Sequence, residues 1–505
     1  MINYILKIML SPQSTIAVYA CCCCLIGAAH GLTLDLSNWM GQLSPILGDA
    51  SILDLSVPGT HDSVTFDLST DLSDGFEGLP PLVSDILHAL TPVIAGGFIR
   101  EQGQTQGLNM TEQLDSGMRF IDFRIMYSDP PAPEVYDSGT DTALAKAASA
   151  AAGATKDWYG LHGCQTQRTS LSFLEAAKAW LVAHPKEVVV FWSSRHGDNS
   201  LNGTTQYPDT TPAQRQAFWK QIVTTFDGLL FDASTSPLNE TSIATMLSRG
   251  QRVVWFAADW ADFTGSDARA MPNEMIENQL PSSGDETGAL GVFRTGAATR
   301  ASQKARNRFF LASLADSGPT CQVEYAALIK FLPIDVTADC KSMAKCFNIP
   351  GVDDWCPLTL MEYGLFNNYY NQRMIEQAWI EGATNAAVDF PNAIYIDVVD
   401  HGGAIRVGTQ RINPLERKVL DGYGGGTGSI GHNTTGYAYA ATVIGQNVRR
   451  LCRGKPATQR CGEDLLAAIE TARAALPLTL WNDTSFGRLD TNWPVLPPAA
   501  VEHFR

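Results

Sequence analysis

The stretch SVPGTHDSVTFD, Ser56 to Asp67, follows the apolar run SILDL and places a Pro-Gly turn directly before Thr-His-Asp-Ser. We interpret it as the end of a buried strand, with His61 and Asp62 at the exit. A single histidine in such a place is more often a satisfied surface group than a functional one. The role of His61 therefore depends on whether other segments supply chemical partners for it.

Short apolar runs alternate with segments of helical spacing along the chain. The runs at 188–192, 252–258 and 393–399 (VVVFW, RVVWFAA and AIYIDVV) are nearly continuous in apolar residues, which is typical of parallel strands covered on both faces by helices. The segment SLSFLEAAKAWLVA at 170–183 spaces its apolar residues as a helix does. This alternation predicts an α/β fold, either a TIM-type barrel or a doubly wound sheet.

Polar residues follow the predicted strands at or near the point where each one ends. They are His61 with Asp62, Asp122 with Arg124, His162, Ser193 with Ser194 and Arg195, Asp259, and Asp397 with Asp400. In a (β/α) barrel the functional groups come from the C-terminal ends of different strands. We therefore expect a TIM-type barrel, irregular and with long loop insertions, in which these strand exits share one site.

We expect three parts along the chain. Residues 1–29 carry one charge, Lys7, and an apolar run that ends in small residues, as in a secretory signal peptide; an uncleaved anchor is the alternative. Residues 30–410 form the barrel with its insertions, and residues 411–505 form a Gly-rich loop and a C-terminal helical extension on the barrel exterior. The Gly-rich stretch 422–436 has no preceding strand and no GxGxxG or GKS pattern, so we interpret it as a surface loop rather than a phosphate-binding loop.

Composition restricts the class of partner. Of the 505 residues, 45% are hydrophobic and 17% are charged, as in a compact globular protein, and the net charge is −16. An acidic chain without a basic stripe is not expected to bind nucleic acid, nor to be held at anionic lipid by its overall field. A lipid head group would have to be recognised by a local pocket. We expect a monomer.

The cysteines and the glycosylation sequons favour an extracellular protein. Cys21 to Cys24 would leave with the signal peptide, and the seven cysteines that remain do not have the spacing of a zinc site. In an oxidising compartment we expect disulfides, namely Cys452 with Cys461 and two more within the segment 321–356, and one unpaired thiol that the spacing does not identify. Five Asn-x-Thr sequons agree with secretion; they begin at Asn109, Asn202, Asn239, Asn433 and Asn482.

Three motifs in order carry a family resemblance, namely PGTHDS at 58–63, GMRFIDFR at 117–124 and LHG at 161–163. Together they resemble the X domain of phosphatidylinositol-specific phospholipases C, above all the small metal-independent bacterial type and its secreted fungal relatives. The resemblance covers about residues 48–200 and extends to a last strand at 394–400. We identify no counterpart in that family for the middle of the chain or for its last hundred residues.

The resemblance implies a reaction in which the inositol 2-hydroxyl attacks the neighbouring phosphorus, expels diacylglycerol and leaves a cyclic phosphodiester. It implies that His61 is the general base, that His162 is the general acid, and that Arg124 holds the phosphate. By the same resemblance, Asp62 would orient His162 or share a proton with it.

The resemblance also assigns the carboxylate on the last strand and bears on metals. Asp397 matches the carboxylate that steadies the first histidine, with Asp400 as the alternative. Calcium-dependent members have Asn after the first histidine and an acidic pair in the second motif, where this chain has Asp62, Asp122 and Arg124. An arginine in place of a calcium ligand brings its own charge, so we expect no catalytic metal and no cofactor.

Asp122 and Arg119 also have structural interpretations. Asp122 is either part of the site or a partner of backbone amides or of Arg119. Arg119 itself is expected in a surface ion pair, and His184 at the end of a helix.

Three further residues are candidates for substrate contact, namely Arg195, Asp259 and Tyr369. Tyr369 belongs to the aromatic segment EYGLFNNYYNQ at 362–372, which could cover a lipid mouth or stack on a sugar, although such residues are more often core. Asp259 lies where the bacterial enzymes have a basic residue. The resemblance therefore supports phosphodiester chemistry in this chain better than it supports a particular head group.

We expect a secreted phosphodiesterase that acts on the head group of an inositol phospholipid or a glycosylinositol phospholipid at a membrane surface. Two alternatives stay open. One is a related barrel enzyme acting on another phosphodiester, such as a glycerophosphodiester or sphingomyelin, usually with a divalent ion. The other is a non-catalytic glycoprotein that binds lipid or carbohydrate, which the intact set His61, Asp62, Arg124 and His162 disfavours.

Overall fold

The computed structural model of the chain describes residues 33–72, 92–131, 155–194, 210–279, 291–294, 296–315, 360–399, 436–453 and 463–474. The expected signal peptide and almost all of the Gly-rich stretch lie outside these residues. Of the seven cysteines that follow residue 29, the structure describes Cys164 and Cys452. The other five lie outside the described residues, and with them the partners in the expected disulfides; they are Cys321, Cys340, Cys346, Cys356 and Cys461. Among the described helices, none is long and apolar enough to cross a lipid bilayer.

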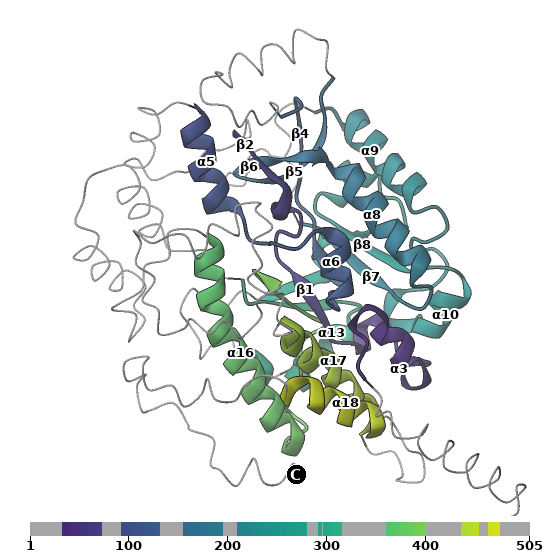
Figure 1. Cartoon of the computed structure of the whole chain (residues 1–505). Helices are drawn as coiled ribbons and strands as arrows, with labels where there is room; N and C mark the ends of the chain where they lie inside the picture. The colour runs from purple at the N-terminus through teal and green to yellow at the C-terminus, as the bar shows by residue number, and fades with distance from the viewer. Residues whose placement is uncertain are drawn as a thin grey trace, which may run out of the picture.

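Eight strands form the main sheet, and every pairing within it is parallel (Figure 1). In spatial order they are β10 (Ile276–Gln279), β11 (Phe309–Ser313), β12 (Ala393–Ile396), β1 (Val57–Thr60), β3 (Phe120–Asp122), β7 (Val189–Ser193), β8 (Val253–Ala257) and β9 (Met271–Pro272).

The two ends of this strand order belong to one segment of chain. β9 and β10 are separated only by the 3-10 helix η5 (Asn273–Met275), so this segment pairs with β8 at its start and with β11 at its end. The sheet therefore nearly closes into a barrel, and the irregularity in its strand order lies at η5. The expectation of an irregular TIM-type barrel is confirmed, and the doubly wound sheet is wrong.

The barrel strands point successive side chains to opposite faces of the sheet, as any strand does. On β3, Phe120 packs inside the barrel against Phe309 and Tyr395, with ring centroids 5.7 and 5.9 Å away. The next residue, Ile121, belongs to a second core, which includes Phe191 and the inner faces of α8 (Ser170–Ala183) and α9 (Pro212–Thr225). Burial on both faces explains why these strands are nearly continuous apolar runs in the sequence.

A second sheet of four antiparallel strands begins where β3 ends. Its order is β2 (Leu68–Leu72), β6 (Cys164–Thr169), β5 (Asp157–His162) and β4 (Ile125–Ser128). The expectation that DWYGLH is a barrel strand is wrong, because this segment is β5 and pairs antiparallel with both β4 and β6. His162 therefore approaches the barrel from the second sheet. Cys164 on β6 is a buried thiol beside the Gly96 carbonyl.

The remaining helices lie around the barrel, except α5, which packs against β2 and β6 of the second sheet (Figure 1). They are α3 (Trp39–Leu47), α5 (Pro92–Gly103), α6 (Met110–Asp115), α10 (Ile243–Ser248), α11 (Trp260–Thr264), α13 (Gly296–Ala305), α16 (Leu360–Thr384), α17 (Gly436–Cys452) and α18 (Glu463–Ala474), with the 3-10 helices η1 (Leu36–Asn38), η2 (Ile52–Asp54), η3 (Thr65–Asp67) and η4 (Leu238–Glu240).

The predicted C-terminal helices are present as α17 and α18, but α17 does more than cover the exterior. The hydroxyl of its buried Tyr439 donates to the carbonyl of Ile394 on β12 at 2.5 Å and accepts from the amide of Gly59 on β1 at 3.3 Å. Asn447 adds two hydrogen bonds of 2.7 Å to the backbone of Ser56. Helix α17 is therefore attached to two neighbouring barrel strands, β12 and β1.

Candidate active site

Four of the five residues expected to carry catalysis lie just after the C-terminal ends of three neighbouring barrel strands. His61 and Asp62 directly follow β1, Arg124 lies two residues after β3, and Asp397 directly follows β12. In the sheet, β1 lies between β12 and β3. Because these strands are parallel, their C-terminal ends meet at one rim of the barrel, where the four side chains come into contact.

His61 is buried, and both of its ring nitrogens have partners. Nδ1 lies 2.8 Å from Oδ1 of Asp397, and Nε2 lies 2.8 Å from Nη2 of Arg124. Since a guanidinium only donates, Nε2 is the accepting nitrogen and we assign the imidazole proton to Nδ1. The ring also stacks on Tyr395, with centroids 5.1 Å apart and planes at 5°. His61 is thus a neutral imidazole with a lone pair at Nε2, as a general base requires.

Burial lowers the pKa of His61 to about 4, from an ordinary value of 6.5. Asp62 opposes this shift and the positive charge of Arg124 adds to it. Burial also raises the pKa of Asp397 well above its ordinary value, while Arg124 acts in the opposite direction. At neutral pH, His61 therefore stays unprotonated until a substrate supplies a proton.

Asp62 connects the two histidines. Its Oδ2 atom lies 3.5 Å from Nε2 of His61 and 3.4 Å from Nε2 of His162, and its Oδ1 atom contacts Nε of Arg124. The residue has a φ of +44°, in the left-handed region that disfavours residues with a side chain. Its backbone amide donates to Oδ2 of Asp122 at 3.2 Å, which helps to hold this strained conformation.

His162 reaches the same carboxylate from the second sheet. Its Nδ1 atom lies 2.6 Å from the carbonyl oxygen of Gly103, the last residue of α5. Since a carbonyl only accepts, Nδ1 carries a proton and Nε2 is the nitrogen that faces Asp62. The rings of His162 and His61 are 6.4 Å apart between centroids. The two imidazoles therefore share one carboxylate oxygen, and the role expected of Asp62 stays a prediction.

Asp122 belongs to the same cluster. Its Oδ2 atom lies 3.3 Å from Nη2 of Arg124 and 3.9 Å from Nε2 of His61, and the hydroxyl of Ser194 donates to its Oδ1 atom at 2.5 Å. Asp122 is thus both a partner of a backbone amide, that of Asp62, and a member of the site. Sequence reasoning left its role open and gave no role to Tyr395, although both precede recognised site residues by two positions on the same strand segment.

The expectation that Arg119 forms a surface pair is wrong. Arg119 is fully buried, donates to Oε2 of Glu187 from two nitrogens at 3.0 and 2.8 Å, and stacks over the ring of Trp180. The carbonyls of Leu114 and Met118 accept from its Nη1 atom. A buried guanidinium is tolerated when its donors are satisfied in this way. Arg119 does not contact Asp122 and is a structural residue.

A metal ion has one candidate position among the described residues. His61, Asp62 and Asp122 each offer one atom within 4.8 Å of the others. The guanidinium of Arg124 contacts all three residues, so a cation bound at the same atoms would have to displace it. Three ligand atoms are also fewer than the roughly six to eight oxygens that calcium takes. This donor set suits an arginine better than calcium.

Of the three predicted substrate contacts, Asp259 is the one whose side chain the structure describes, and the described contacts do not join it to the cluster. Asp259 follows β8 and is exposed at the start of α11, with a φ of +46°. The charges that act on it are those of Asp262, Arg215 and Glu274. Arg195, the alternative carboxylate Asp400 and the side chain of Tyr369, a residue of α16, lie outside the described residues. The roles of these residues stay predictions.

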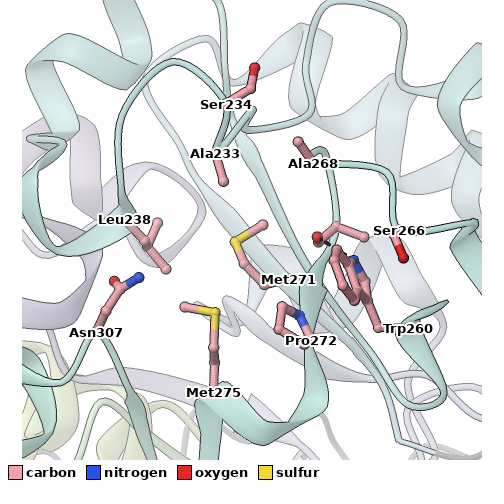
Figure 2. A pocket seen from close by; sticks show the side chains of 11 residues that line it. Ala233, Ser234, Leu238, Trp260, Ser266, Ala268, Met271, Pro272, Met275 and Asn307 are labelled. Carbon is pink, nitrogen blue, oxygen red and sulfur yellow. Dashed lines mark hydrogen bonds between the residues drawn. The ribbon is translucent and has the colours of Figure 1, made fainter.

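A separate pocket of about 260 Å³ lies beside η5, where the strand order closes (Figure 2). Figure 2 shows the side chains of Met271 and Met275 and the indole of Trp260 around it. None of the lining residues belongs to the cluster at the barrel rim. The pocket and the cluster are therefore distinct features.

Comparison with known proteins gives several similar sequences, although no family model matches the chain. PI-PLC X domain-containing protein 1 of Mus musculus is 31% identical over 159 residues, which are 31% of this chain and 38% of that protein. PI-PLC X domain-containing protein 3 of Homo sapiens is 28% identical over 156 residues, which are 31% of this chain and 41% of that protein. The chain thus spans about two fifths of the length of these curated relatives.

A shorter match concerns the variant-surface-glycoprotein phospholipase C of Trypanosoma cruzi, 25% identical over 100 residues, which are 20% of this chain and 26% of that protein. Among solved structures, a phosphatidylinositol-specific phospholipase C of Staphylococcus aureus has a TM-score of 0.41 and 15% identity, with coverage of 75% of this chain and 95% of that chain. Over about a third of its length, the part that carries the three ordered motifs, the chain is thus similar to proteins of the phosphatidylinositol-specific phospholipase C X-domain family.

Proposed function

We propose that the chain is a phosphodiesterase that cleaves an inositol phospholipid or a glycosylinositol phospholipid by metal-free acid–base catalysis. The observation that carries the proposal is that one carboxylate oxygen faces both histidines. Oδ2 of Asp62 lies 3.5 Å from Nε2 of His61 and 3.4 Å from Nε2 of His162. Together with Arg124, this gives a base, an acid and a fixed positive charge at one rim of the barrel. Intramolecular phosphoryl transfer needs these three groups.

In the proposed reaction, Nε2 of His61 takes the proton of the inositol 2-hydroxyl while the hydroxyl oxygen bonds to phosphorus. The bond between phosphorus and the glycerol oxygen breaks, and Nε2 of His162 gives its proton to that leaving oxygen. The products are diacylglycerol and a cyclic inositol phosphate, and no water is consumed in this step. Arg124 stabilises the negative charge that builds up on the phosphoryl oxygens.

Arg124 changes partner in this scheme. In the substrate-free geometry its Nη2 atom donates to Nε2 of His61 at 2.8 Å, and this is the lone pair that would take the hydroxyl proton. A phosphate is a stronger acceptor for a guanidinium than a neutral imidazole is. We infer that phosphate binding draws Arg124 away from His61 and so makes the base available only when substrate is present.

The head group and the place of action belong to the proposal. The relatives support the phosphodiesterase class, and the phospholipase C named for a surface glycoprotein supports glycosylinositol lipids as an alternative to phosphatidylinositol. The signal-like leader and the five sequons support action outside the cell. We propose that the protein works there as a monomer at a membrane surface.

The test is phosphorus NMR of phosphatidylinositol vesicles in the presence of EDTA, with wild type, His61→Ala and His162→Ala. A matched control is His184→Ala, because His184 is the C-cap residue of α8, bonds to the carbonyl of Trp180 and is not part of the cluster. We expect cyclic inositol phosphate from wild type and from the control, and losses of at least about a hundredfold for His61→Ala and His162→Ala.

Other results would point elsewhere. Product formed only when a divalent ion is restored would favour the metal-dependent phosphodiesterases. No product from phosphatidylinositol or from a glycosylinositol lipid, together with retained binding to the vesicles, would favour the non-catalytic binding protein.

A further inference from the structure

Helix α5 ends against the proposed acid. The carbonyl oxygen of its last residue, Gly103, accepts a hydrogen bond from Nδ1 of His162 at 2.6 Å. The last carbonyls of a helix have no partner within the helix, and they carry the negative end of the helix dipole. The imidazole of the acid is thus bonded to a group that favours its protonated form.

The same hydrogen bond determines which nitrogen transfers the proton. Because the carbonyl keeps a proton on Nδ1, the nitrogen that gains and loses the catalytic proton is Nε2. Nε2 of His162 lies 3.4 Å from Oδ2 of Asp62, the carboxylate oxygen that also faces Nε2 of His61. The end of α5 therefore acts on both the charge and the orientation of the acid.

Gly103 allows this close approach. A Cβ atom added at position 103 would lie 2.2 Å from the backbone carbonyl oxygen of His162. Backbone atoms cannot move aside as the end of a flexible side chain can, so alanine at this position has to push the end of α5 away from His162. Gly97 lies on the same helix, and nothing is within 4 Å of its Cβ position. The two glycines provide a matched pair of substitutions.

Other charged groups lie on the elements around His162, and they are the same in both variants. Among the described residues on the elements around it, they are Asp62, His61, Asp122 and Arg124 at the barrel rim, Arg100 and Glu101 on α5, Lys156 and Asp157 at the start of β5, and Asp67 on η3, which pairs with Arg168 on β6. A difference between the Gly103 and Gly97 variants therefore reports on the end of α5.

We propose that Gly103 is a positioning residue for the general acid, whose carbonyl keeps His162 protonated and directs Nε2 of His162 toward Asp62 and the leaving group. The inference rests on the proposed function and deepens it, since it concerns the acid of that same site. Disturbing this contact weakens proton donation to the leaving oxygen. The side-chain contacts of the base His61 with Asp397 and of Arg124 with Asp122 do not involve Gly103.

The activity test compares wild type, Gly103→Ala and Gly97→Ala on two substrates across pH. One is phosphatidylinositol, and the other is an inositol phosphate ester with a nitrophenol leaving group, which departs without being protonated. For Gly103→Ala on the lipid, we expect the basic limb of the pH profile of kcat/KM to shift about one pH unit lower. At pH values above this limb, kcat/KM should be roughly tenfold lower than in wild type. The nitrophenyl ester should react at nearly the wild-type rate, and Gly97→Ala should change neither substrate. Equal losses on both substrates, or an unmoved limb, would overturn the inference.

A second readout needs no activity. In protein labelled with nitrogen-15 at histidine, with the His162 signal identified by its absence from His162→Gln, we expect Nδ1 to stay protonated while Nε2 titrates. The midpoint should fall by about one pH unit in Gly103→Ala. A neutral His162 with its proton on Nε2 in wild type would overturn the inference even if Gly103→Ala does not fold. An inactive wild type with the expected nitrogen signals would instead reject the proposed function and leave the positioning role.

Discussion

Nδ1 of His61 lies 2.8 Å from Oδ1 of Asp397, across two adjacent parallel strands. Thr60 on β1 is opposite Ile396 on β12, so the next residue on each strand is a member of this pair. A one-residue slip between the strands would turn one of the two side chains to the opposite face. The contact between base and carboxylate is therefore determined by the register of the barrel.

Replacing Asp397 by Asn tests this pair. The amide can no longer stabilise a positive charge on His61, nor hold the proton on Nδ1 as a carboxylate does, so we expect kcat to fall by roughly a thousandfold with little change in fold. Asp67→Asn is the control, because it removes a carboxylate that pairs with Arg168 at the surface. Steady-state kinetics on phosphatidylinositol measures both, and a loss of less than tenfold for Asp397→Asn would contradict the assignment.

The buried position of His61 predicts that the enzymatic activity persists at acidic pH. Its pKa is lowered to about 4, below the ordinary 6.5, so the free protein keeps the base unprotonated between these two values. The acid limb of kcat/KM reports the base in the free enzyme. We expect this limb well below pH 6.5 and toward 4, measured with lipid presented in neutral detergent. A limb at the ordinary histidine value would show that His61 is not the base or is more exposed in solution.

Much of this site could be predicted from residues that lie close together in the sequence. His61 and Asp62 are consecutive, and Asp122 and Arg124 belong to one motif, so short patterns were enough to find them. The period of two along a strand also holds a signal for Tyr395, which shares its face of the chain with Asp397. The segment AIYIDVV contains this signal, but from the sequence we assign a site role to Asp397 and none to Tyr395.

Other features depend on partners far away in the sequence. Whether DWYGLH joins the barrel or the second sheet is decided by its pairing with β4 and β6, and an apolar strand pattern is the same in both cases. Arg119 looked like a surface charge because its buried partner, Glu187, is 68 residues away. The contact between Gly103 and His162 likewise joins segments that are 59 residues apart. Such pairings follow from tertiary packing and leave no local pattern.

Arg124→Lys tests the need for a planar group with several donors. Lysine keeps the positive charge. Its single ammonium group cannot contact Asp62, Asp122 and His61 simultaneously, whereas the guanidinium of Arg124 contacts all three. We expect kcat/KM to fall by roughly a hundredfold or more, because fewer donors reach the phosphoryl oxygens. Arg168→Lys, at an exposed pair, should be unchanged. Near-normal kinetics of Arg124→Lys would mean that charge alone is sufficient.

Glu187→Gln tests the buried pair with Arg119, which we assign to stability alone. Removing one charge leaves a buried guanidinium without its ionic partner, which costs about 3–5 kcal/mol of unfolding free energy. The exposed pair of Asp67 and Arg168 is the comparison, and Asp67→Asn should cost at most about 1 kcal/mol. Urea unfolding monitored by tryptophan fluorescence measures the two losses. Similar losses for both variants would argue against the structural role given to Arg119.

Tyr439→Phe tests whether the C-terminal helix α17 supports the catalytic strands. Without the hydroxyl, the amide of Gly59 and the carbonyl of Ile394 lose the group that bridges them, at a cost of about 1–3 kcal/mol for buried polar atoms. His61 follows Gly59 by two residues and comes directly after β1, so a shift of β1 also changes its distance to Asp397. We therefore expect a lower free energy of unfolding together with a lower kcat, whereas Tyr127→Phe, on β4, serves as the control. A stable variant with unchanged kcat would mean that α17 only covers the barrel and does not help to set the geometry of its active rim.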